Sequence, residues 1–386
     1  MKKTKAAKIL AVILAFAMLL ACVSPAFAIV IPQDVKNVIL LIGDGMGPNS
    51  LEWTKAELGV ELFMDTLPYQ GYSMTDSLDG TTDSAAGATA LSCGRRVFNS
   101  NLCTLAFKPG SGAIIFSYMN VSEAAKSLGK KAGIVTSDAN HGATPAGFSV
   151  HTYKRDLSEE ITVQQMNSNL DLIWAADGGF SSAEKFESAG WTYSTSMSEL
   201  EQVEYGKRSF AAINGKIEYE TGRKDDAPLS ALTALALKKL DNDKGFFLMV
   251  EGAHIDKNSH SNNKEGMMKS LIEFDKAVET AVNFAKEDGN TIVIVTADHE
   301  TGGITYNEEK KEYEYTSGGH TSANVPLRLY GCDELVKDGA AVKNTEVAKL
   351  IAKKLGYNGL FPKATFNFGF LFDFIAAVIK TIGEKN

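Results

Sequence analysis

Cysteine is scarce in this 386-residue chain, which contains four. None lies in a Cys-x-x-Cys pair or at a Cys/His spacing typical of metal ligands, so thiolate zinc sites are not expected. Cys93 and Cys103 are close enough in sequence to form a disulfide, which would leave Cys332 unpaired. Free buried thiols are the other interpretation, and the spacing does not choose between the two.

The N-terminus lacks a run long enough to span a membrane comfortably, because the apolar stretch Ile9–Cys22 has only 14 residues. Four Lys residues precede this stretch, and Ala26-Phe27-Ala28, which has the form of a cleavage site, follows it. We therefore predict that residues 1–28 are a signal peptide and that the protein is extracytoplasmic: secreted, periplasmic or at the cell surface. The alternative is a lipoprotein, since Leu19–Cys22 resembles a lipoprotein box in which Cys22 is lipidated.

Basic stripes, internal repeats and low-complexity linkers are also absent from the sequence. Removal of residues 1–28 takes away four Lys and no acidic residue, so the net charge moves from −8 to −12. A chain this acidic is a poor binder of nucleic acid, and no nucleic-acid partner is expected. With 44% hydrophobic and 22% charged residues, the chain is expected to form a packed domain over residues 29–365.

The C-terminal segment 366–386 differs in character from the rest of the chain. In a helix its many Phe and Ile residues would lie on most faces rather than in one stripe. One interpretation is an apolar helix docked on the domain. The other is an anchor that contacts a membrane surface.

Apolar, strand-like runs alternate with helical patterns along the chain. This alternation predicts an α/β fold whose largely parallel sheet is covered by helices on both faces. Residues 180–228 are polar and weakly periodic, and we expect surface loops and short elements there. Residues 307–315 predict a small hairpin. The predicted strands are Asn37–Ile42, Lys131–Thr136, Gly245–Val250 and Thr291–Thr296, and the predicted helices are Val121–Leu128, Leu229–Leu240, Met267–Glu287 and Val342–Leu355.

Acidic residues follow three of the predicted strands directly. Asp44, Glu251 and Asp298 each come at the end of an apolar run, and open α/β sheets bind their ligands at the carboxyl ends of their strands. Asp44 is followed by Gly45, and Asp-Gly pairs are common in turns. Asp44 alone therefore predicts no function. Together, the three carboxylates predict a metal site at one edge of the sheet.

Imidazole groups accompany these carboxylates. His299 follows Asp298, and His320 lies beyond a glycine turn. Asp256 and His260 are four residues apart, so a helical turn would place both on one face, where a carboxylate and an imidazole suit zinc.

Hydroxyl and guanidinium groups complete the candidate site. Ser84 precedes a run of small residues that can form a helix, so it is either a plain N-cap or a nucleophile placed where a helix N-terminus attracts phosphate. Thr144 precedes a proline, which favours an extended conformation there. Arg155 could hold two phosphate oxygens through its planar fork.

In this order the segments resemble the alkaline phosphatases over residues 37–330. The strings that carry the resemblance are IGDGMG, TDSAAGATA, ATPAG, FFLMVEGAHIDKNSH and TADHETGG. The resemblance implies the fold of that family, a three-layer α/β/α sandwich around a large, mostly parallel sheet. It also implies an exported enzyme that hydrolyses small phosphate monoesters. A homodimer is implied as well, although the sequence shows no interface to argue from.

The resemblance further implies two zinc ions and one magnesium ion. Nitrogen-rich ligand sets suit zinc, whereas an all-oxygen set suits magnesium. Family members often carry Asp or His two positions before the magnesium Thr, but this chain has Gly142 there, with His141 before it, which leaves the third metal open. The implied ligands are Asp256, His260 and His320 for the first zinc, Asp44, Asp298, His299 and Ser84 for the second, and Asp44, Thr144 and Glu251 for magnesium.

The implied mechanism begins with Ser84, whose alkoxide zinc would stabilise for attack on phosphorus. Arg155, oriented by Asp83, would grip the phosphate oxygens, and Lys257 would reach phosphate through a water. Water then hydrolyses the resulting phosphoserine.

Two other functions stay open at this point. One is a phosphodiesterase or sulfatase of the same superfamily; the other is a surface protein that binds phosphate or metal without turnover. The combination of Ser84, Arg155 and the magnesium ligands favours the monoesterase. Related pyrophosphatases usually use Thr as nucleophile, and sulfatases use a modified Cys or Ser.

Overall fold

The computed structural model describes residues 35–106, 113–213, 217, 227–336 and 340–369, all within one unit of the chain. The predicted signal peptide, residues 1–28, lies outside these residues, as do residues 370–386 of the predicted C-terminal tail. None of the helices in the described part of the chain combines the length and apolarity that a membrane crossing requires.

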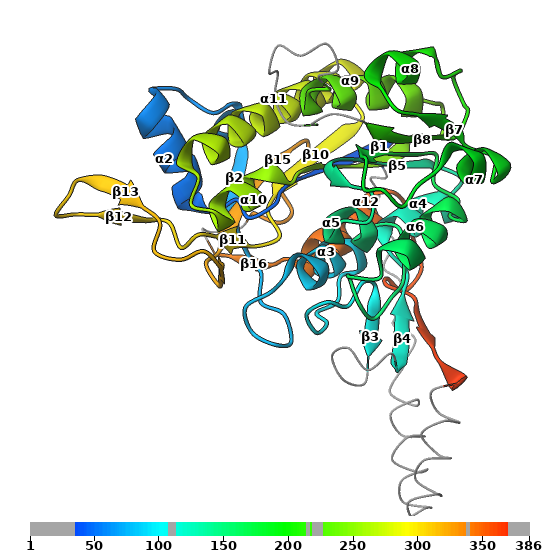
Figure 1. Cartoon of the computed structure of the whole chain (residues 1–386), viewed down its shortest axis with the longest axis horizontal. Coiled ribbons are helices and arrows are strands. Elements are labelled where there is room, and N and C mark those ends of the chain that lie inside the picture. Colours follow the sequence, from blue (N-terminus) through cyan, green and yellow to red (C-terminus); the bar gives the residue numbers. More distant parts are fainter. Residues whose placement is uncertain (1–34, 107–112, 214–216, 218–226, 337–339, 370–386) are drawn as a thin grey trace, which may run out of the picture. The chain divides into compact units, whose positions relative to one another are not determined.

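A ten-stranded sheet forms the centre of the molecule (Figure 1). Its neighbouring strands are parallel except where β15 pairs with β10 and β2, so β15 alone runs against the others. The prediction of a mostly parallel sheet is therefore confirmed. In spatial order the strands are β16 (Val342–Lys343), β2 (Tyr69–Met74), β15 (Val325–Tyr330), β10 (Thr291–Thr296), β1 (Asn37–Gly43), β9 (Phe246–Gly252), β5 (Lys131–Ala139), β6 (Leu172–Ala176), β8 (Ser209–Ile213) and β7 (Thr192–Ser194).

Helices cover both faces of this sheet, which gives the predicted three layers (Figure 1). Alternate residues of β1 show the division, because Ile39 and Leu41 pack in one core whereas Val38, Leu40 and Ile42 pack in the other. The first face carries α2 (Pro48–Leu58), η1 (Phe63–Thr66), α8 (Met197–Gln202), α9 (Leu229–Leu240), α10 (His254–His260) and α11 (Lys264–Asp288), and the second carries α3 (Ser84–Cys93), α4 (Val121–Ser127), α5 (Ala143–Gly147), α6 (Ser158–Met166), α7 (Ala183–Ser188) and α12 (Thr345–Lys354).

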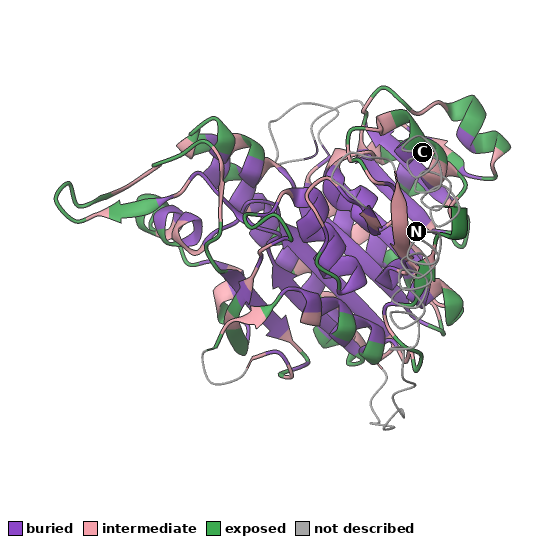
Figure 2. Cartoon of the chain, turned by 90° about the horizontal axis from the view of Figure 1, so that it is seen from below, coloured by how far each residue is buried: buried purple, intermediate pink, exposed green. Residues whose placement is uncertain are grey.

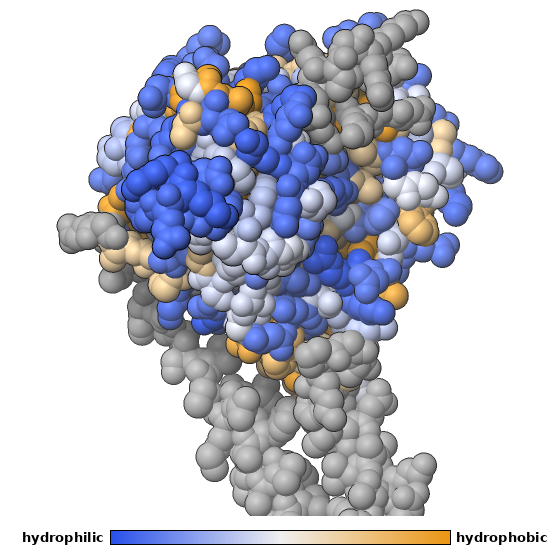
Figure 3. Space-filling view, turned by 60° about the vertical axis from the view of Figure 1, so that its left-hand side comes forward, coloured by the Kyte–Doolittle hydropathy of each residue, from blue (hydrophilic) through white to orange (hydrophobic). Residues whose placement is uncertain are grey.

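The inner strands are buried on both faces, whereas the hairpin of β12 (Thr305–Asn307) and β13 (Glu312–Glu314) is largely exposed (Figure 2). This hairpin was predicted at 307–315. Two smaller sheets complete the fold: β11 (Glu300–Thr301) pairs with β14 (His320–Thr321), and β4 (Ile114–Tyr118) lies between β3 (Thr104–Ala106) and β17 (Ala364–Phe366). On the face seen in Figure 3, hydrophilic side chains dominate and hydrophobic ones form only scattered patches.

Two local predictions were wrong. The stretch 180–228 contains short elements, but its strand β8 is fully buried in the main sheet rather than exposed in a loop. A strand that is covered on both faces shows no alternation of apolar and polar residues, and β8 has only five residues. The sequence pattern therefore did not reveal it. The helix predicted from Val342 begins at Thr345, because Val342–Lys343 pairs with β2 as strand β16.

Cys93, Cys103 and Cys332 are buried free thiols. The Cys103 thiol donates to the carbonyl of Gly147 at 2.9 Å, and the Cys93 thiol to that of Tyr118 at 3.5 Å. Of the two interpretations of the cysteines, the structure therefore shows the second.

Candidate active site

The register of three adjacent parallel strands brings the strand-end carboxylates together. Ile42 of β1 lies beside Glu251 of β9 and Thr296 of β10. Asp44 and Asp298 each follow two residues beyond this level, so all three acidic groups lie at the carboxyl edge of the sheet. All three are buried.

A first group of candidate metal-binding side chains comes from helix α10 and strand β14. Asp256 and His260 lie one turn apart on α10, with Asp256 Oδ1 3.4 Å from His260 Nε2. His320 Nε2 is 3.7 Å from the same oxygen. The predicted helical spacing is confirmed, and the three ligand atoms lie close enough together to hold one ion.

The two histidines of this group turn their Nε2 atoms toward one another. His260 Nδ1 donates to the Gly318 carbonyl at 2.7 Å, and His320 Nδ1 donates to the Thr82 carbonyl at 2.9 Å. The Nε2 atoms of the two rings lie only 3.1 Å apart, both beside the Asp256 carboxylate. Once a metal ion displaces the Nε2 protons, two imidazoles and one carboxylate face the same space, which is a donor set that suits zinc.

A second group consists of Asp44, Asp298 and His299, all buried. His299 Nε2 lies 3.5 Å from Asp44 Oδ1, 3.3 Å from Asp298 Oδ2 and 3.1 Å from the Ser84 hydroxyl oxygen. Neither of these two carboxylate oxygens has a hydrogen-bond partner, although both are buried. Buried polar atoms without partners are rare in folded proteins, and an ion among them would satisfy both.

The oxygen ligands predicted for a third ion also lie together. Thr144 is almost fully buried, its hydroxyl lies close to the Glu251 carboxylate, and it has no partner at hydrogen-bond geometry. The prediction of an extended backbone at Thr144 was wrong, because Thr144 lies in helix α5. Pro145 is tolerated there because the first turn of a helix does not use its N–H groups.

Helix α3 presents Ser84 at its N-terminus, but Ser84 is not the N-cap. Asp83 is, since its Oδ1 accepts from the Ala86 N–H at 2.9 Å. Its other oxygen accepts from Arg155 Nη1 at 3.2 Å and from the Ser100 N–H at 3.0 Å. One carboxylate thus caps the helix and holds the guanidinium beside Ser84, as predicted for Asp83 and Arg155.

Comparisons with known proteins agree with this geometry. The sequence profile of the alkaline phosphatase family matches residues 35–172 and 175–354. Alkaline phosphatase 3 of Bacillus subtilis is 32% identical over 347 residues, which are 84% of this chain and 73% of the relative. The alkaline phosphatase of Escherichia coli is 30% identical, over 69% of this chain and 70% of the relative.

The chain belongs to the alkaline phosphatase family. Among solved structures, the alkaline phosphatase of the Antarctic bacterium TAB5 superposes with a TM-score of 0.73 at 30% identity, covering 85% of this chain and 99% of that one. The protein is thus a hydrolase of a metal-dependent family that acts on phosphate monoesters. Its fold is confirmed as that of the family, and neither the diesterase nor the non-catalytic alternative is favoured.

The electrostatics of the alkaline phosphatase site fit metal ions. Burial raises the pKa of Asp44 well above its usual value, and repulsion from Asp298 and Asp256 adds to this effect. Burial and the nearby charge of Asp138 raise the pKa of Glu251 to about 8. Several carboxylates packed in a buried site repel one another, and divalent cations relieve that repulsion.

The histidine pKa values have two different causes. Burial lowers the pKa of His299 to about 4, so its ring is neutral and ready to bind a metal. The hydrogen bond with Asp256 raises the pKa of His260 to about 9. A metal ion therefore has to displace a proton from His260, and its binding should weaken as the pH falls.

Three residues of the site escaped the sequence analysis. The Thr301 hydroxyl donates to Asp256 Oδ1 and accepts from His299 Nδ1, so it links the two metal-binding groups. Asp138 forms an ion pair with Lys257, which the sequence analysis had directed toward phosphate. Glu300 accepts from the Ile304 N–H and from the Thr321 hydroxyl. The sequence gives one signal for Thr301 and Glu300, which is their position next to His299. It gives none for Asp138.

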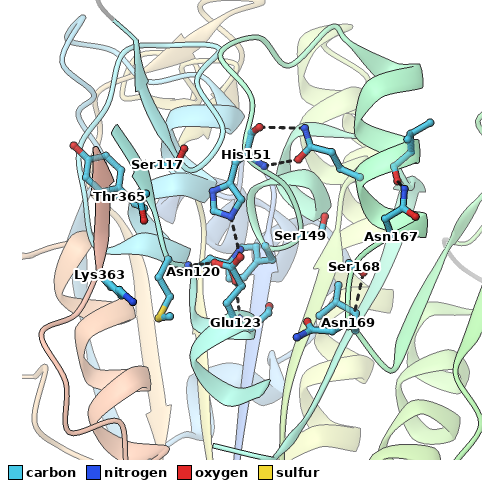
Figure 4. A pocket seen from close by; sticks show the side chains of 17 residues that line it. Ser117, Asn120, Glu123, Ser149, His151, Asn167, Ser168, Asn169, Lys363 and Thr365 are labelled. Carbon is cyan, nitrogen blue, oxygen red and sulfur yellow. Dashed lines mark hydrogen bonds and ion pairs between the residues drawn. The ribbon is translucent and has the colours of Figure 1, made fainter. Parts of the chain in front are cut away.

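A further cavity lies away from these residues. It has a volume of about 700 Å³ and lies between α4, the end of α6 and the strands β4 and β17. Figure 4 shows His151 at its wall, with Nε2 2.9 Å from a Glu123 oxygen. None of the predicted site residues lines this cavity.

Proposed function

We propose that the chain is an exported alkaline phosphatase that hydrolyses phosphate monoesters through a phosphoserine intermediate, with two zinc ions and one magnesium ion. The observation that carries the proposal is the convergence of the Ser84 hydroxyl with His299 and the unpartnered oxygens of Asp44 and Asp298. A hydroxyl at a helix N-terminus beside a metal-binding group is the arrangement that an activated serine nucleophile requires.

The donor sets support the assignment of metals. Asp256, His260 and His320 would hold one zinc, and Asp44, Asp298 and His299 the other, with Ser84 beside it. Asp44, Thr144 and Glu251 offer only oxygen, which suits magnesium. When bound, the ions lower the pKa of the attacking oxygen and stabilise charge on the entering and leaving groups.

The chain's own side chains bind and orient the phosphate. Arg155, fixed by Asp83, offers two parallel N–H donors to two phosphate oxygens. The free N–H groups at the start of α3 add a positive potential near Ser84. The Ser84 oxygen forms a bond to phosphorus as the ester P–O bond breaks and the alcohol leaves with a proton. Water then attacks phosphorus, and Ser84 and inorganic phosphate are released.

A related enzyme supports magnesium in the third site. Two variants of the TAB5 alkaline phosphatase, with one histidine replaced by glutamate or by aspartate, are described with magnesium bound in a site called M3. In that enzyme, magnesium is thus found in the M3 site of variants that carry a carboxylate in place of a histidine. The third group of this chain, Asp44, Thr144 and Glu251, offers two carboxylates and a hydroxyl, which favours the same ion.

The proposal of export depends on the predicted signal peptide, residues 1–28. The mass of the mature protein distinguishes cleavage after Ala28 from lipidation of Cys22. The homodimer and the membrane-surface contact of residues 366–386 also stay predictions. The oligomeric state measured by light scattering, and partitioning onto vesicles with and without 366–386, would test them.

Replacement of the nucleophile tests the proposed mechanism. Ser84→Ala should lower kcat for p-nitrophenyl phosphate by roughly 10³-fold or more, while the protein keeps two equivalents of zinc. Acid quenching during turnover of a labelled substrate should trap label on the wild type and not on the variant. Ser92→Ala, in the same helix but directed toward Cys93, is the matched control and should keep both the rate and the label. An unchanged rate in Ser84→Ala would exclude the nucleophile assignment.

A further inference from the structure

Gly142 leaves a space that a neighbouring carboxylate fills. A Cβ atom at position 142 would lie 2.5 Å from Asp138 Oδ2 and 2.9 Å from Asp138 Cγ. Asp138 comes from the end of β5, four residues earlier in the chain. The side chain of Asp138 therefore lies where a side chain of residue 142 would begin, and only glycine at 142 permits this.

The two oxygens of Asp138 have different surroundings. Oδ1 accepts from the ammonium group of Lys257 and from the Ala139 N–H, the latter at 2.8 Å. Within the described residues, Oδ2 accepts no hydrogen bond. It is thus a charged acceptor directed toward position 142, and Lys257 fixes the other half of the carboxylate.

Asp138 is also joined to the oxygen ligands of the third site. Its N–H donates to the Thr136 hydroxyl at 2.9 Å, and that hydroxyl donates to Glu251 Oε2. Beside Glu251 lies the buried hydroxyl of Thr144, which has no hydrogen-bond partner. A buried hydroxyl that has no partner at hydrogen-bond geometry and lies beside a carboxylate points to an ion among these groups.

We propose that Asp138 completes the third metal site, supplying from strand β5 the carboxylate that residue 142 cannot provide. The inference rests on the proposed function and deepens it. Magnesium keeps several of its waters in proteins, and Asp138 Oδ2 accepts hydrogen bonds from this hydration shell. Lys257 positions Asp138 and balances its charge. Because Asp44, Glu251, Thr144 and Asp138 all offer oxygen, the third site selects magnesium over zinc.

Magnesium binding measured by calorimetry tests this role without reference to turnover. Chelated protein is reloaded with two equivalents of zinc and titrated with MgCl₂. Wild type should bind one magnesium, and Asp138→Asn should weaken its affinity by about 10- to 100-fold, the usual effect of losing an outer partner of a metal site. Asp171→Asn is the matched control, because Asp171 is equally half-buried and paired with Lys126 at 2.6 Å, but lies at the opposite end of β5. Its magnesium affinity should match wild type.

A carboxylate swap separates a role at the metal from a merely structural one. Asp138→Gly should lose magnesium affinity like Asp138→Asn. Adding Gly142→Asp to Asp138→Gly returns a carboxylate to the same space from the other backbone position, so affinity should recover to near the wild-type value. Gly142→Asp alone crowds Asp138 and should give no gain.

Three results would overturn the proposal: wild type that binds two zinc ions but no magnesium, Asp138→Asn with wild-type magnesium affinity, or a swap that keeps two zinc ions and fails to recover affinity. The second and third results leave the proposed function standing, because the zinc content and the Ser84→Ala assay are measured separately. The first result would also remove magnesium from the proposed function, while leaving its zinc sites and its nucleophile untouched. Loss of the zinc sites themselves would instead count against the proposed function.

Discussion

Gly45 sets how closely the backbone can approach the first metal-binding group. Its φ of +73° lies in the left-handed region, and a Cβ there would lie 2.9 Å from the Asp256 Cα and 2.8 Å from the Thr301 hydroxyl. Gly45→Ala should therefore displace Asp256 and lower both zinc content and kcat/KM, the latter by about tenfold or more. Metal analysis and steady-state kinetics would measure the two effects.

Gly59 is the matched control for this substitution. It also has a positive φ, +62°, but a Cβ there meets nothing within 4 Å. Gly59→Ala should show the backbone strain alone, with slightly lower stability and unchanged zinc content. Equal zinc loss in both variants would contradict the contact argument.

The pair of His151 and Glu123 makes stability depend on pH. Burial opposes the charge on His151, but its hydrogen bond with Glu123 is the main cause that raises its pKa from 6.5 to about 9. Because the folded pKa lies above the unfolded one, the stabilisation is complete below about pH 6.5 and is lost as the pH rises through about 9.

Glu123→Gln should therefore destabilise the protein more at pH 6 than at pH 10. The effect should not exceed about 1 kcal/mol, because the Glu123 side chain is 40% exposed. The one side-chain oxygen of Gln keeps the capping box of α4, so the change removes the charge and the oxygen that faces His151. Thermal unfolding of both proteins at the two pH values measures the difference, and an equal difference at both would refute the pair's role.

The individual candidate ligands could be picked out from the sequence because each follows an apolar run or a helical spacing. Asp44, Asp298 and the pair of Asp256 with His260 carry such local signals. Asp138 and Thr301 do not, since their roles depend on contacts with residues distant in the chain. Thr301 lies 45 residues from Asp256 in sequence, and no local pattern can show that the two touch.

At the level of elements, Asp83 has two contacts at the start of helix α3. It caps the helix, and it binds Arg155, the proposed phosphate-binding residue. Asp83→Ala removes both the N-cap and the partner of Arg155, and should cost about 1–2 kcal/mol of unfolding free energy. Asp83→Asn keeps a good N-cap but loses the charge that orients Arg155. It should lose less stability than Asp83→Ala, while both variants raise KM several-fold. Chemical denaturation and steady-state kinetics separate the two effects, and equal destabilisation by both substitutions would contradict the capping role.

Elements were predictable where their pattern is long. Helix α9 and strand β10 have the predicted bounds because their apolar residues repeat over whole elements. Strand β8 was missed because five residues buried on both faces show no alternation. Helix α5 was missed because the preference of Thr144 for an extended backbone before Pro145 is weaker than the packing of α5 against α3, where a Cβ on Gly147 would lie 2.7 Å from Ala88.

For the whole molecule, the parallel sheet is what assembles the site. Residues from β1, β9 and β10 meet at one edge because β1 lies between β9 and β10 and runs in the same direction, although β1 is more than 200 residues from both in the chain. Helices α3 and α10 then add the proposed nucleophile and two proposed ligands of the first metal-binding group. The central claim is that this assembly works only when its buried carboxylates and imidazoles hold metal ions.

Turnover of p-nitrophenyl phosphate by chelated protein tests that claim most directly. Chelation should abolish activity, zinc alone should restore most of it, magnesium alone should restore none, and the two together should restore it fully. If the thoroughly chelated protein still turns over substrate at the original rate, the metal-dependent account of the site is wrong.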